Sequence, residues 1–141
     1  MITRSKQQTI TLGKKISAKL KGGDVVLLYG ELGAGKTTLV KGIAKYFGIK
    51  KEITSPTFTL MNIYNIKTLK HKNIKTLIHI DTYRLKDERE LIEIGAEDYL
   101  GAPDTVCVIE WPEKLHKLLK NKKMISIKIT HKSKKERSIN I

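Results

Sequence analysis

Residues 30–38, with the sequence G-E-L-G-A-G-K-T-T, have the residue types and spacing that most clearly indicate chemistry. They fit the pattern G-x-x-x-x-G-K-[ST], with Gly30, Gly35, Lys36 and Thr37 in register, which is typical of a phosphate-binding loop (P-loop). In such a loop, backbone N–H groups converge on a polyphosphate, and glycine is needed where a Cβ would clash. The lysine ammonium would lie on the β and γ phosphates, and the threonine hydroxyl would ligate Mg²⁺.

The segments on either side of this loop favour a P-loop over an accidental glycine-rich turn. The apolar run Asp24–Tyr29 predicts a buried strand before the loop, and apolar residues at helical spacing from Leu39 to Phe47 predict a helix after it. This is the context that the motif requires. We therefore expect a polyphosphate to contact Gly30, Glu31, Leu32, Gly33, Ala34, Gly35, Lys36, Thr37 and Thr38.

Two later apolar runs each end on an acidic residue. Residues 76–80 precede Asp81, and residues 105–109 precede Glu110. The carboxyl ends of parallel strands meet at one edge of a sheet, so both carboxylates are expected near the loop, where Mg²⁺ and an attacking water would lie. A strand-end acid is a weak signal by itself, and the pattern leaves open which of the two contacts the metal.

The segment Thr54–Thr59 contains one more candidate ligand. Its proline biases the preceding residue to an extended conformation, so the segment is expected to enter a strand over Phe58–Tyr64 through an ordered turn. Thr57 lies 21 positions after Lys36, where nucleotide hydrolases hold a switch threonine that responds to the γ phosphate and Mg²⁺. The alternative is a threonine selected only for its strand propensity.

Helices and strands that could position these side chains follow from the hydrophobic pattern. A helix is expected over Ser5–Leu20, and alternating isoleucines predict a strand over Ile125–Ile129 with a return strand near Ile139–Ile141. We therefore predict an α/β fold: a P-loop NTPase-like mixed parallel and antiparallel sheet flanked by helices, with a C-terminal antiparallel hairpin. A chain of 141 residues is expected to form a single domain over residues 1–141.

Composition bounds the class of partner. The formal net charge of +14 favours nucleic acid, but lysine (24) greatly outnumbers arginine (4), which also follows from an A/T-rich coding sequence, so contact with RNA is left open. No apolar stretch of ~18 residues and no signal-peptide pattern occur, which predicts a cytoplasmic protein that does not contact membranes. The only cysteine, Cys107, excludes a disulfide or a thiolate metal site within one chain.

Four segments of the sequence, taken together, resemble one family. They are G-E-L-G-A-G-K-T-T, S-P-T-F-T-L, H-I-D-T-Y-R-L and V-I-E-W-P-E-K, and in this order they are similar to the TsaE family, formerly YjeE. The resemblance also includes R-E-L-I-E-I-G-A-E-D-Y-L and runs from the first expected helix to the final hairpin. It implies an ATP-binding, weakly hydrolysing protein that acts with TsaB and TsaD in the biosynthesis of threonylcarbamoyladenosine (t6A) in tRNA.

The resemblance also implies roles for individual residues. Residues 32–38 would hold the phosphates of ATP, and Thr37 with Glu110 would line the Mg²⁺ site. Asp81 falls in the Walker B position, where it would orient or deprotonate the attacking water. On this hypothesis, position and charge stabilisation supply most of the catalysis, and the expected catalytic residues are Lys36, Asp81 and Glu110.

Several positions keep more than one interpretation. Trp111 is expected to support the site by packing, whereas Arg84 could stabilise charge or contact a partner. Ile63 stands where many family members carry an acid, and the polar, basic loop Asn65–Lys75, expected at the tip of a hairpin, looks longer than usual. Both departures concern the partner or RNA face, and tRNA contact by the loop is left open.

Two other functions share the same loop. A small P-loop kinase would need a lid of arginines over the phosphates, which four arginines can hardly supply. A non-catalytic, nucleotide-gated binding module would act on tRNA or protein without hydrolysis. A GTPase is disfavoured because the guanine-binding pattern N-K-x-D appears only as Asn121–Met124, without the acid.

Overall fold

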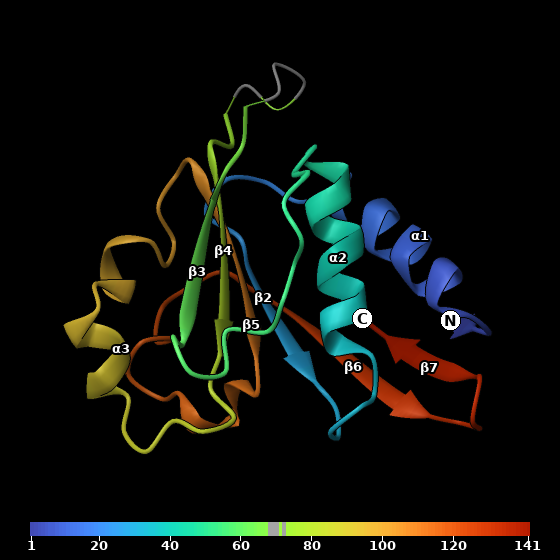
Figure 1. The fold of residues 1–141 in the computed structure, drawn as a ribbon. Coiled ribbons are helices and arrows are strands. Elements are labelled where there is room, and N and C mark those ends of the chain that lie inside the picture. Colours follow the sequence, from blue (N-terminus) through green and yellow to red (C-terminus); the bar gives the residue numbers. More distant parts are fainter. Residues whose placement is uncertain (68–70, 72) are drawn as a thin grey trace.

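The computed structural model describes residues 1–67, 71 and 73–141. Its strands form one sheet in the order β1-β7-β6-β2-β5-β4-β3 (Figure 1). The strands are β1 (Ile2–Thr3), β2 (Val25–Tyr29), β3 (Met61–Asn65), β4 (Thr76–Asp81), β5 (Thr105–Glu110), β6 (Met124–His131) and β7 (Arg137–Asn140). The helices are α1 (Lys6–Ser17), α2 (Lys36–Tyr46) and α3 (Arg89–Glu93), with short 3₁₀ turns η2 (Ala96–Asp98) and η3 (Pro112–Lys114).

The middle of the sheet is parallel and its edges are antiparallel. Strands β6, β2, β5 and β4 run in one direction, whereas β3 pairs antiparallel with β4, and β7 pairs antiparallel with β6 and β1. This arrangement confirms the predicted α/β fold with a mixed sheet and a C-terminal hairpin. In the register of the parallel strands, Glu110 lies opposite Leu28 on one side and opposite Asp81 on the other.

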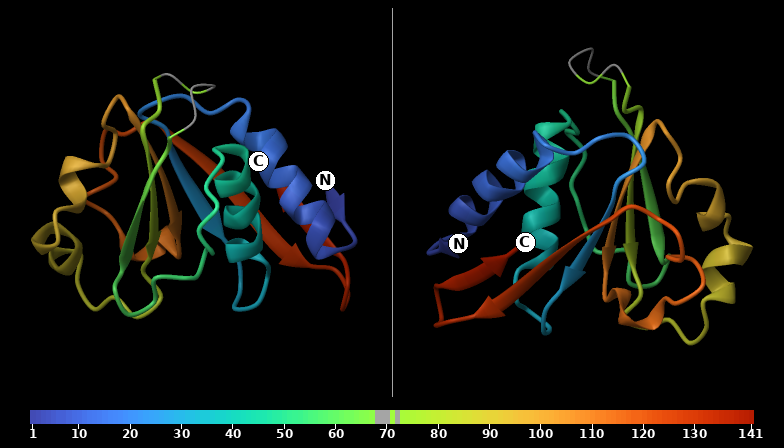
Figure 2. Two further views of the ribbon diagram at one scale, coloured as in Figure 1. Left: turned by 45° about the horizontal axis from the view of Figure 1, so that its top comes forward. Right: turned by 180° about the vertical axis from the view of Figure 1, so that it is seen from behind.

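Helices cover both faces of the sheet. Helices α1 and α2 lie on one face and α3 lies on the other, as the two views of Figure 2 show. Strand β2 contributes alternate residues to the two cores: Val26 and Leu28 belong to the core under α1 and α2, and Val25 and Leu27 to the core under α3. Within the described part of the chain, no helix is long and apolar enough to span a lipid bilayer.

Helices α1 and α2 touch through their backbones. A Cβ added to Gly13 would lie 2.6 Å from the Leu39 carbonyl oxygen, and one added to Gly42 would lie 2.2 Å from the Ile10 carbonyl oxygen. Real Cβ atoms do not approach backbone atoms this closely, so only glycine fits at either position. The two helices therefore form one tightly packed layer over the sheet.

Two expected boundaries are wrong. The helix expected over Ser5–Leu20 ends at Ser17. The strand expected over Phe58–Tyr64 begins only at Met61, because the residues before it form a turn. In that turn Leu60 has a φ of 67°, in the left-handed region, and donates its N–H to the Pro56 carbonyl at 2.7 Å.

The hydrophobic pattern of the sequence predicts the strands at one edge of the sheet but not the strand at the other edge. Strands β3 and β4 flank the expected hairpin, but positions 68–70 and 72 of the loop Asn65–Lys75 lie outside the described residues. The sequence pattern does not predict β1, because two residues carry no periodicity. Its position follows only from pairing with β7, where Ile2 lies opposite Ser138.

Candidate functional site

The loop between β2 and α2 holds the first group of candidate residues. Gly30 is required by space, because a Cβ there would lie 2.6 Å from the Ile129 carbonyl oxygen of β6. Gly35 is required by conformation, because it caps α2 with a φ of 106°, which side-chain-bearing residues rarely adopt. The loop therefore curves so that the N-terminus of α2, with its free N–H groups, faces the carboxyl edge of the sheet.

A cavity of about 310 Å³, here called the phosphate cavity, opens over this N-terminus. Residues from the loop and from three later segments line it. They are Leu32, Gly33, Ala34, Gly35, Lys36, Thr37, Thr38, Ser55, Thr57, Asp81, Tyr83, Glu110 and Trp111. Of the residues expected in contact with phosphates, Gly30 and Glu31 do not line this cavity; they line a neighbouring hollow instead.

Lys36 lies inside the loop rather than in solvent. Its Nζ donates hydrogen bonds to the carbonyl oxygens of Gly30 (2.6 Å) and Glu31 (2.9 Å), and it lies 4.0 Å from the centre of the Trp111 ring. Burial lowers the pKa of the ammonium, and the nearby carboxylate of Glu110 opposes this shift. The two residues outside the phosphate cavity thus hold the lysine through their carbonyl groups.

Thr37 and Glu110 meet across the cavity. The Thr37 hydroxyl donates a 2.8 Å hydrogen bond to Oε1 of Glu110, and Nε2 of the fully buried His79 lies 3.7 Å from the same oxygen. Burial by itself would raise the pKa of Glu110, but the imidazole of His79 and the contacts with Asp81 and Thr37 outweigh it and lower that pKa. Glu110 is therefore held as a carboxylate.

Asp81 has a different environment from Glu110, although it lies beside it on β4. Its Oδ1 accepts a 2.9 Å hydrogen bond from the Tyr83 backbone N–H, and its Oδ2 accepts one from the Ser55 hydroxyl. Burial raises the pKa of Asp81, and the hydrogen bonds from Ser55 and Tyr83 only partly oppose this. Of the two neighbouring carboxyl groups, Asp81 is therefore the one that takes up a proton first.

The segment around Thr57 reaches the cavity through Ser55. The two hydroxyl oxygens lie 3.3 Å apart, and Ser55 in turn contacts Asp81. A chain of polar groups therefore links the expected switch threonine to the strand-end acid. The S-P-T spacing places both hydroxyls toward the cavity, since Pro56 between them is buried.

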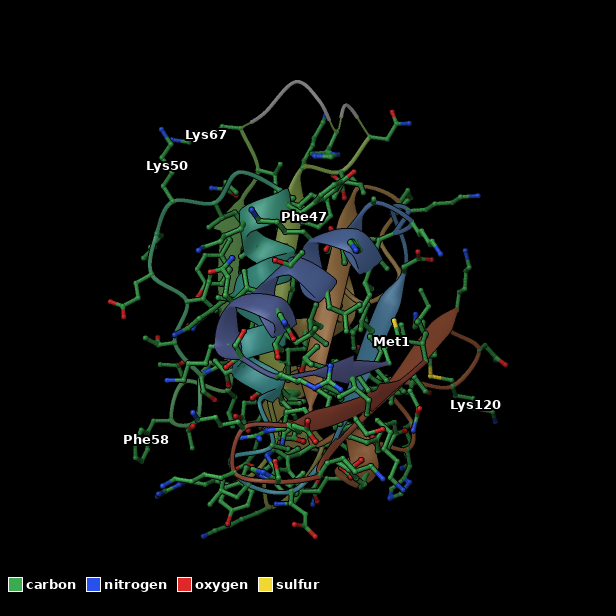
Figure 3. All side chains as sticks on the ribbon, turned by 90° about the vertical axis from the view of Figure 1, so that its right-hand side faces the viewer. Met1, Phe47, Lys50, Phe58, Lys67 and Lys120 are labelled. Carbon is green, nitrogen blue, oxygen red and sulfur yellow. The ribbon has the colours of Figure 1, made fainter. Side chains whose placement is uncertain are left out.

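Aromatic residues frame the open side of the cavity. Trp111 has a φ of 61°, in the left-handed region, and its ring lies 4.9 Å from that of Tyr83. Arg84 does not line the cavity; its guanidinium lies 4.7 Å from the centre of the Phe58 ring, and Phe58 projects from the ribbon (Figure 3). Sequence reasoning missed Tyr83 and His79, although each lies two positions from Asp81 along the chain.

A second cavity of about 490 Å³, here called the rear cavity, adjoins the loop. It shares Gly33, Gly35 and Thr38 with the phosphate cavity and is otherwise lined by Arg4, Ser5, Lys6, Thr9, Lys134, Lys135 and Arg137. Arg137 supports the loop directly, because its Nε donates a 3.0 Å hydrogen bond to the Ala34 carbonyl oxygen. The sequence pattern gives no sign of this contact, since the two residues are far apart in the chain.

The oxygen donors in the phosphate cavity fit a hard cation. Within the described residues, no cluster of three or more His, Cys, Asp or Glu side chains forms a metal cage. Mg²⁺ does not need one, because it keeps several waters and is held by one or two carboxylates together with phosphate oxygens. The Thr37 hydroxyl and the Glu110 carboxylate supply such a partial oxygen set.

Comparisons with known proteins point to one family. The chain matches the family model described as "Threonylcarbamoyl adenosine biosynthesis protein TsaE" over residues 3–139. The tRNA threonylcarbamoyladenosine biosynthesis protein TsaE of Treponema pallidum is 43% identical over 114 residues, which cover 81% of this chain and 78% of the relative. The protein with the same description from Bacillus subtilis is 36% identical over 122 residues, covering 86% of this chain and 72% of the relative.

A solved structure has the same fold. The crystal structure of Bacillus subtilis YdiB matches with a TM-score of 0.71 at 31% sequence identity, and the match covers 99% of this chain and 80% of that chain. The arrangement of the sheet and its helices is therefore shared over nearly the whole described chain.

Proposed function

The chain belongs to the TsaE family of tRNA threonylcarbamoyladenosine biosynthesis, and from this premise we propose that it is a Mg²⁺-dependent ATPase that supports this modification of tRNA. It would act together with the TsaB and TsaD proteins, with slow hydrolysis in their absence. The proposed site of this reaction is the cytoplasm.

The observation that carries the proposal is the hydrogen bond between Thr37 and Glu110. It joins the first turn of α2, where a P-loop presents its metal-binding hydroxyl, to the end of β5. The pKa of Glu110 is lowered despite burial, so the carboxylate is charged and ready to hold a cation. When bound, Mg²⁺ would neutralise the charge that develops on the phosphate oxygens.

The other residues of the phosphate cavity have roles that follow from their positions. The backbone N–H groups of residues 32–38 would receive the phosphates at the N-terminus of α2. Lys36, held by two loop carbonyls, would present its ammonium to the β and γ phosphates. Asp81, which accepts hydrogen bonds from Ser55 and Tyr83, would orient the attacking water or take its proton.

The rear cavity offers room for the nucleoside. It borders Thr38, the last residue of the loop, and its volume of about 490 Å³ is that of a pocket for a small ligand. Its lining residues include Ser5, Thr9 and Thr38, whose hydroxyl groups are of the kind that hydrogen-bond a ribose. We therefore expect the phosphates in the phosphate cavity and the nucleoside in the rear cavity.

The rim of the phosphate cavity suits contact with a protein. Leu32, which lines the cavity, is 71% exposed and Phe58 is 81% exposed, and apolar side chains that together form one exposed patch mark interaction sites. Phe58 lies next to Thr57, the expected switch residue. Docking of TsaB and TsaD there would order this segment and couple partner binding to hydrolysis.

The positions of the arginines disfavour a kinase. None of the four lines the phosphate cavity. They contact other groups: Glu136 for Arg4, the Phe58 ring for Arg84, Asp87 for Arg89 and the Ala34 carbonyl for Arg137. A kinase lid would need arginines over the phosphates, so transfer of the γ phosphate to water fits these positions better than transfer to another substrate.

Phosphate release by the purified chain, with and without TsaB and TsaD, tests the proposal. Lys36→Ala is expected to lose ATP binding and hydrolysis, whereas Lys41→Ala, a lysine of the same helix outside the cavity, should keep both. Full activity of Lys36→Ala in the presence of the partners would refute the assignment. If a nonhydrolysable ATP analogue supports repeated rounds of tRNA modification, the chain is a nucleotide-gated binding module and not an ATPase.

A further inference from the structure

Charge is distributed very unevenly over the molecule. Helices α1 and α2 contain no acidic residue, and their solvent-facing lysines continue past the helix ends. We call this set the lysine face: Lys14, Lys15, Lys19, Lys41, Lys45, Lys50 and Lys51. In contrast, residues 87–98, which include α3 and η2 on the other face of the sheet, contain six acids and one arginine.

The charges of the lysine face are not neutralised within the protein. Among the described residues, the ion pairs are Arg4–Glu136, His79–Glu110, Arg89–Asp87 and Lys123–Asp24, and none involves this face. Like charges gathered on one surface repel one another and weaken the fold. An external polyanion that binds this surface would remove that repulsion.

The shape of the surface suits an extended partner. The backbone contact of Gly13 with Gly42 brings α1 and α2 together as one layer without a large side chain between them. Lys14, Lys15 and Lys45 are exposed and Lys41 is half-buried, so the lysines of both helices reach solvent from this layer. Lys50 lies beyond the end of α2 at one end of the molecule, near the level of Lys67 in Figure 3.

The same surface lacks what a membrane or a protein partner would require. The exposed large apolar residues of the chain all lie outside α1 and α2. Helices that bind a lipid surface insert an apolar face, and protein interfaces are centred on aromatic or apolar anchors and depleted of lysine. Phosphates in a row need only cations, which makes a nucleic-acid backbone the matching occupant.

We propose that the lysine face binds the phosphate backbone of tRNA without reading its sequence. Lysine is a compact point charge that contacts single phosphates, and this face contains no arginine, the side chain whose planar fork is best suited to bidentate recognition. The identity of the RNA rests on the proposed function, since that function acts on tRNA. The binding surface itself rests only on the charge distribution and the packing of α1 and α2.

Two variants with equal loss of charge test the proposal. The first replaces three lysines of the face, Lys14→Gln, Lys15→Gln and Lys19→Gln. The control replaces three exposed lysines elsewhere, Lys86→Gln, Lys117→Gln and Lys120→Gln; Lys120 lies far from Lys50 in Figure 3. Thermal melting of both variants checks that they are folded.

Binding of a fluorescein-labelled, unmodified tRNA transcript is measured by anisotropy over a range of NaCl concentrations, without nucleotide or partners. The logarithm of the binding constant should fall linearly with the logarithm of salt concentration. The face variant should lose about 0.7–0.9 of slope for each phosphate contact removed, or about two to three for all three lysines, whereas the control should keep the wild-type slope.

Three outcomes would overturn the proposal: no binding by the wild type at ~0.15 M salt, an equal loss in both variants, or binding only to vesicles of phosphatidylcholine and phosphatidylserine. ATP binding by the same samples separates this inference from the proposed function. Intact ATP binding without tRNA binding would refute the lysine face alone. Intact tRNA binding without ATP binding would refute the ATPase alone.

Discussion

The Thr37 hydroxyl donates a 2.8 Å hydrogen bond to the carboxylate of Glu110, and this contact joins two segments 73 positions apart in the chain. It exists because β2, which leads into the loop, pairs in parallel with β5, which ends on the acid. The contact makes Glu110, rather than Asp81, the carboxylate that shares the proposed metal site with the loop. Asp81 instead accepts hydrogen bonds from Ser55 and Tyr83, and its proposed role is to orient the attacking water.

Replacement of Thr37 should separate metal binding from nucleotide binding. Thr37→Ala removes one proposed Mg²⁺ oxygen and leaves Glu110 without its hydrogen-bond donor, so partner-stimulated phosphate release should fall by about 10- to 100-fold. Thr37→Ser keeps the hydroxyl and should stay near the wild type. The measurement is a Mg²⁺ titration of hydrolysis. An unchanged Mg²⁺ dependence in Thr37→Ala would show that this hydroxyl is not a ligand.

The two carboxyl groups should respond to pH in opposite ways. Burial raises the pKa of Asp81, so its charged form costs stability as pH rises above its ordinary pKa of 3.8. Asp81→Asn should therefore raise the free energy of unfolding near neutral pH, and the gain should vanish in acid. Thermal melting of the metal-free protein from about pH 3 to pH 7 measures it.

A variant of Glu110 provides the control, because its stability should change in the opposite direction. Although burial acts to raise the pKa of Glu110, contacts with His79, Asp81 and Thr37 lower it, so its charged form contributes stability above its ordinary pKa of 4.5. Glu110→Gln should therefore lower stability near neutral pH, and the loss should vanish as pH falls through the lowered pKa. The same direction of change in both variants would contradict the opposite pKa shifts.

The contact of α1 with α2 predicts an unusual effect of alanine. In a solvent-exposed helix, replacing glycine with alanine gains up to ~1 kcal/mol of stability. At Gly42 the new Cβ would lie 2.2 Å from the Ile10 carbonyl oxygen, so Gly42→Ala should instead cost about 1–3 kcal/mol by forcing the helices apart. Denaturant unfolding measures the change, and a stabilised Gly42→Ala variant would mean that the helices are not in contact.

The single thiol should be inert in the folded protein. Burial raises the pKa of Cys107 to about 12, and the side chain is fully buried in β5. Because the thiolate is the reactive form, iodoacetamide should label Cys107 near pH 8 only after denaturant unfolds the chain. Rapid labelling of the native protein would show that β5 opens readily.

Local patterns predicted the parts of the structure that depend on neighbouring residues. The loop, helix α2 and the strands that end on Asp81 and Glu110 are all found where the hydrophobic pattern and the glycines indicate. The strand predicted over Phe58–Tyr64 was wrong at its start, because Leu60 adopts a left-handed conformation that a strand pattern does not reveal. The position of β1 depends on a partner strand near the other end of the chain.

The sequence by itself predicted a phosphate-binding loop of nine consecutive residues, because the donors and their spacing lie within one loop, and residues 32–38 of it line the phosphate cavity. It also indicated two strand-end acids, but treated them alike. Only the tertiary structure distinguished them. The strand order places Glu110 between β2 and β4, where it contacts Thr37 and His79. Asp81 instead accepts a hydrogen bond from Ser55. The physical reason is that the pKa of a carboxyl group depends on its burial and on the groups around it. Those groups come from distant parts of the chain, and only the register of the sheet brings them next to the carboxyl group.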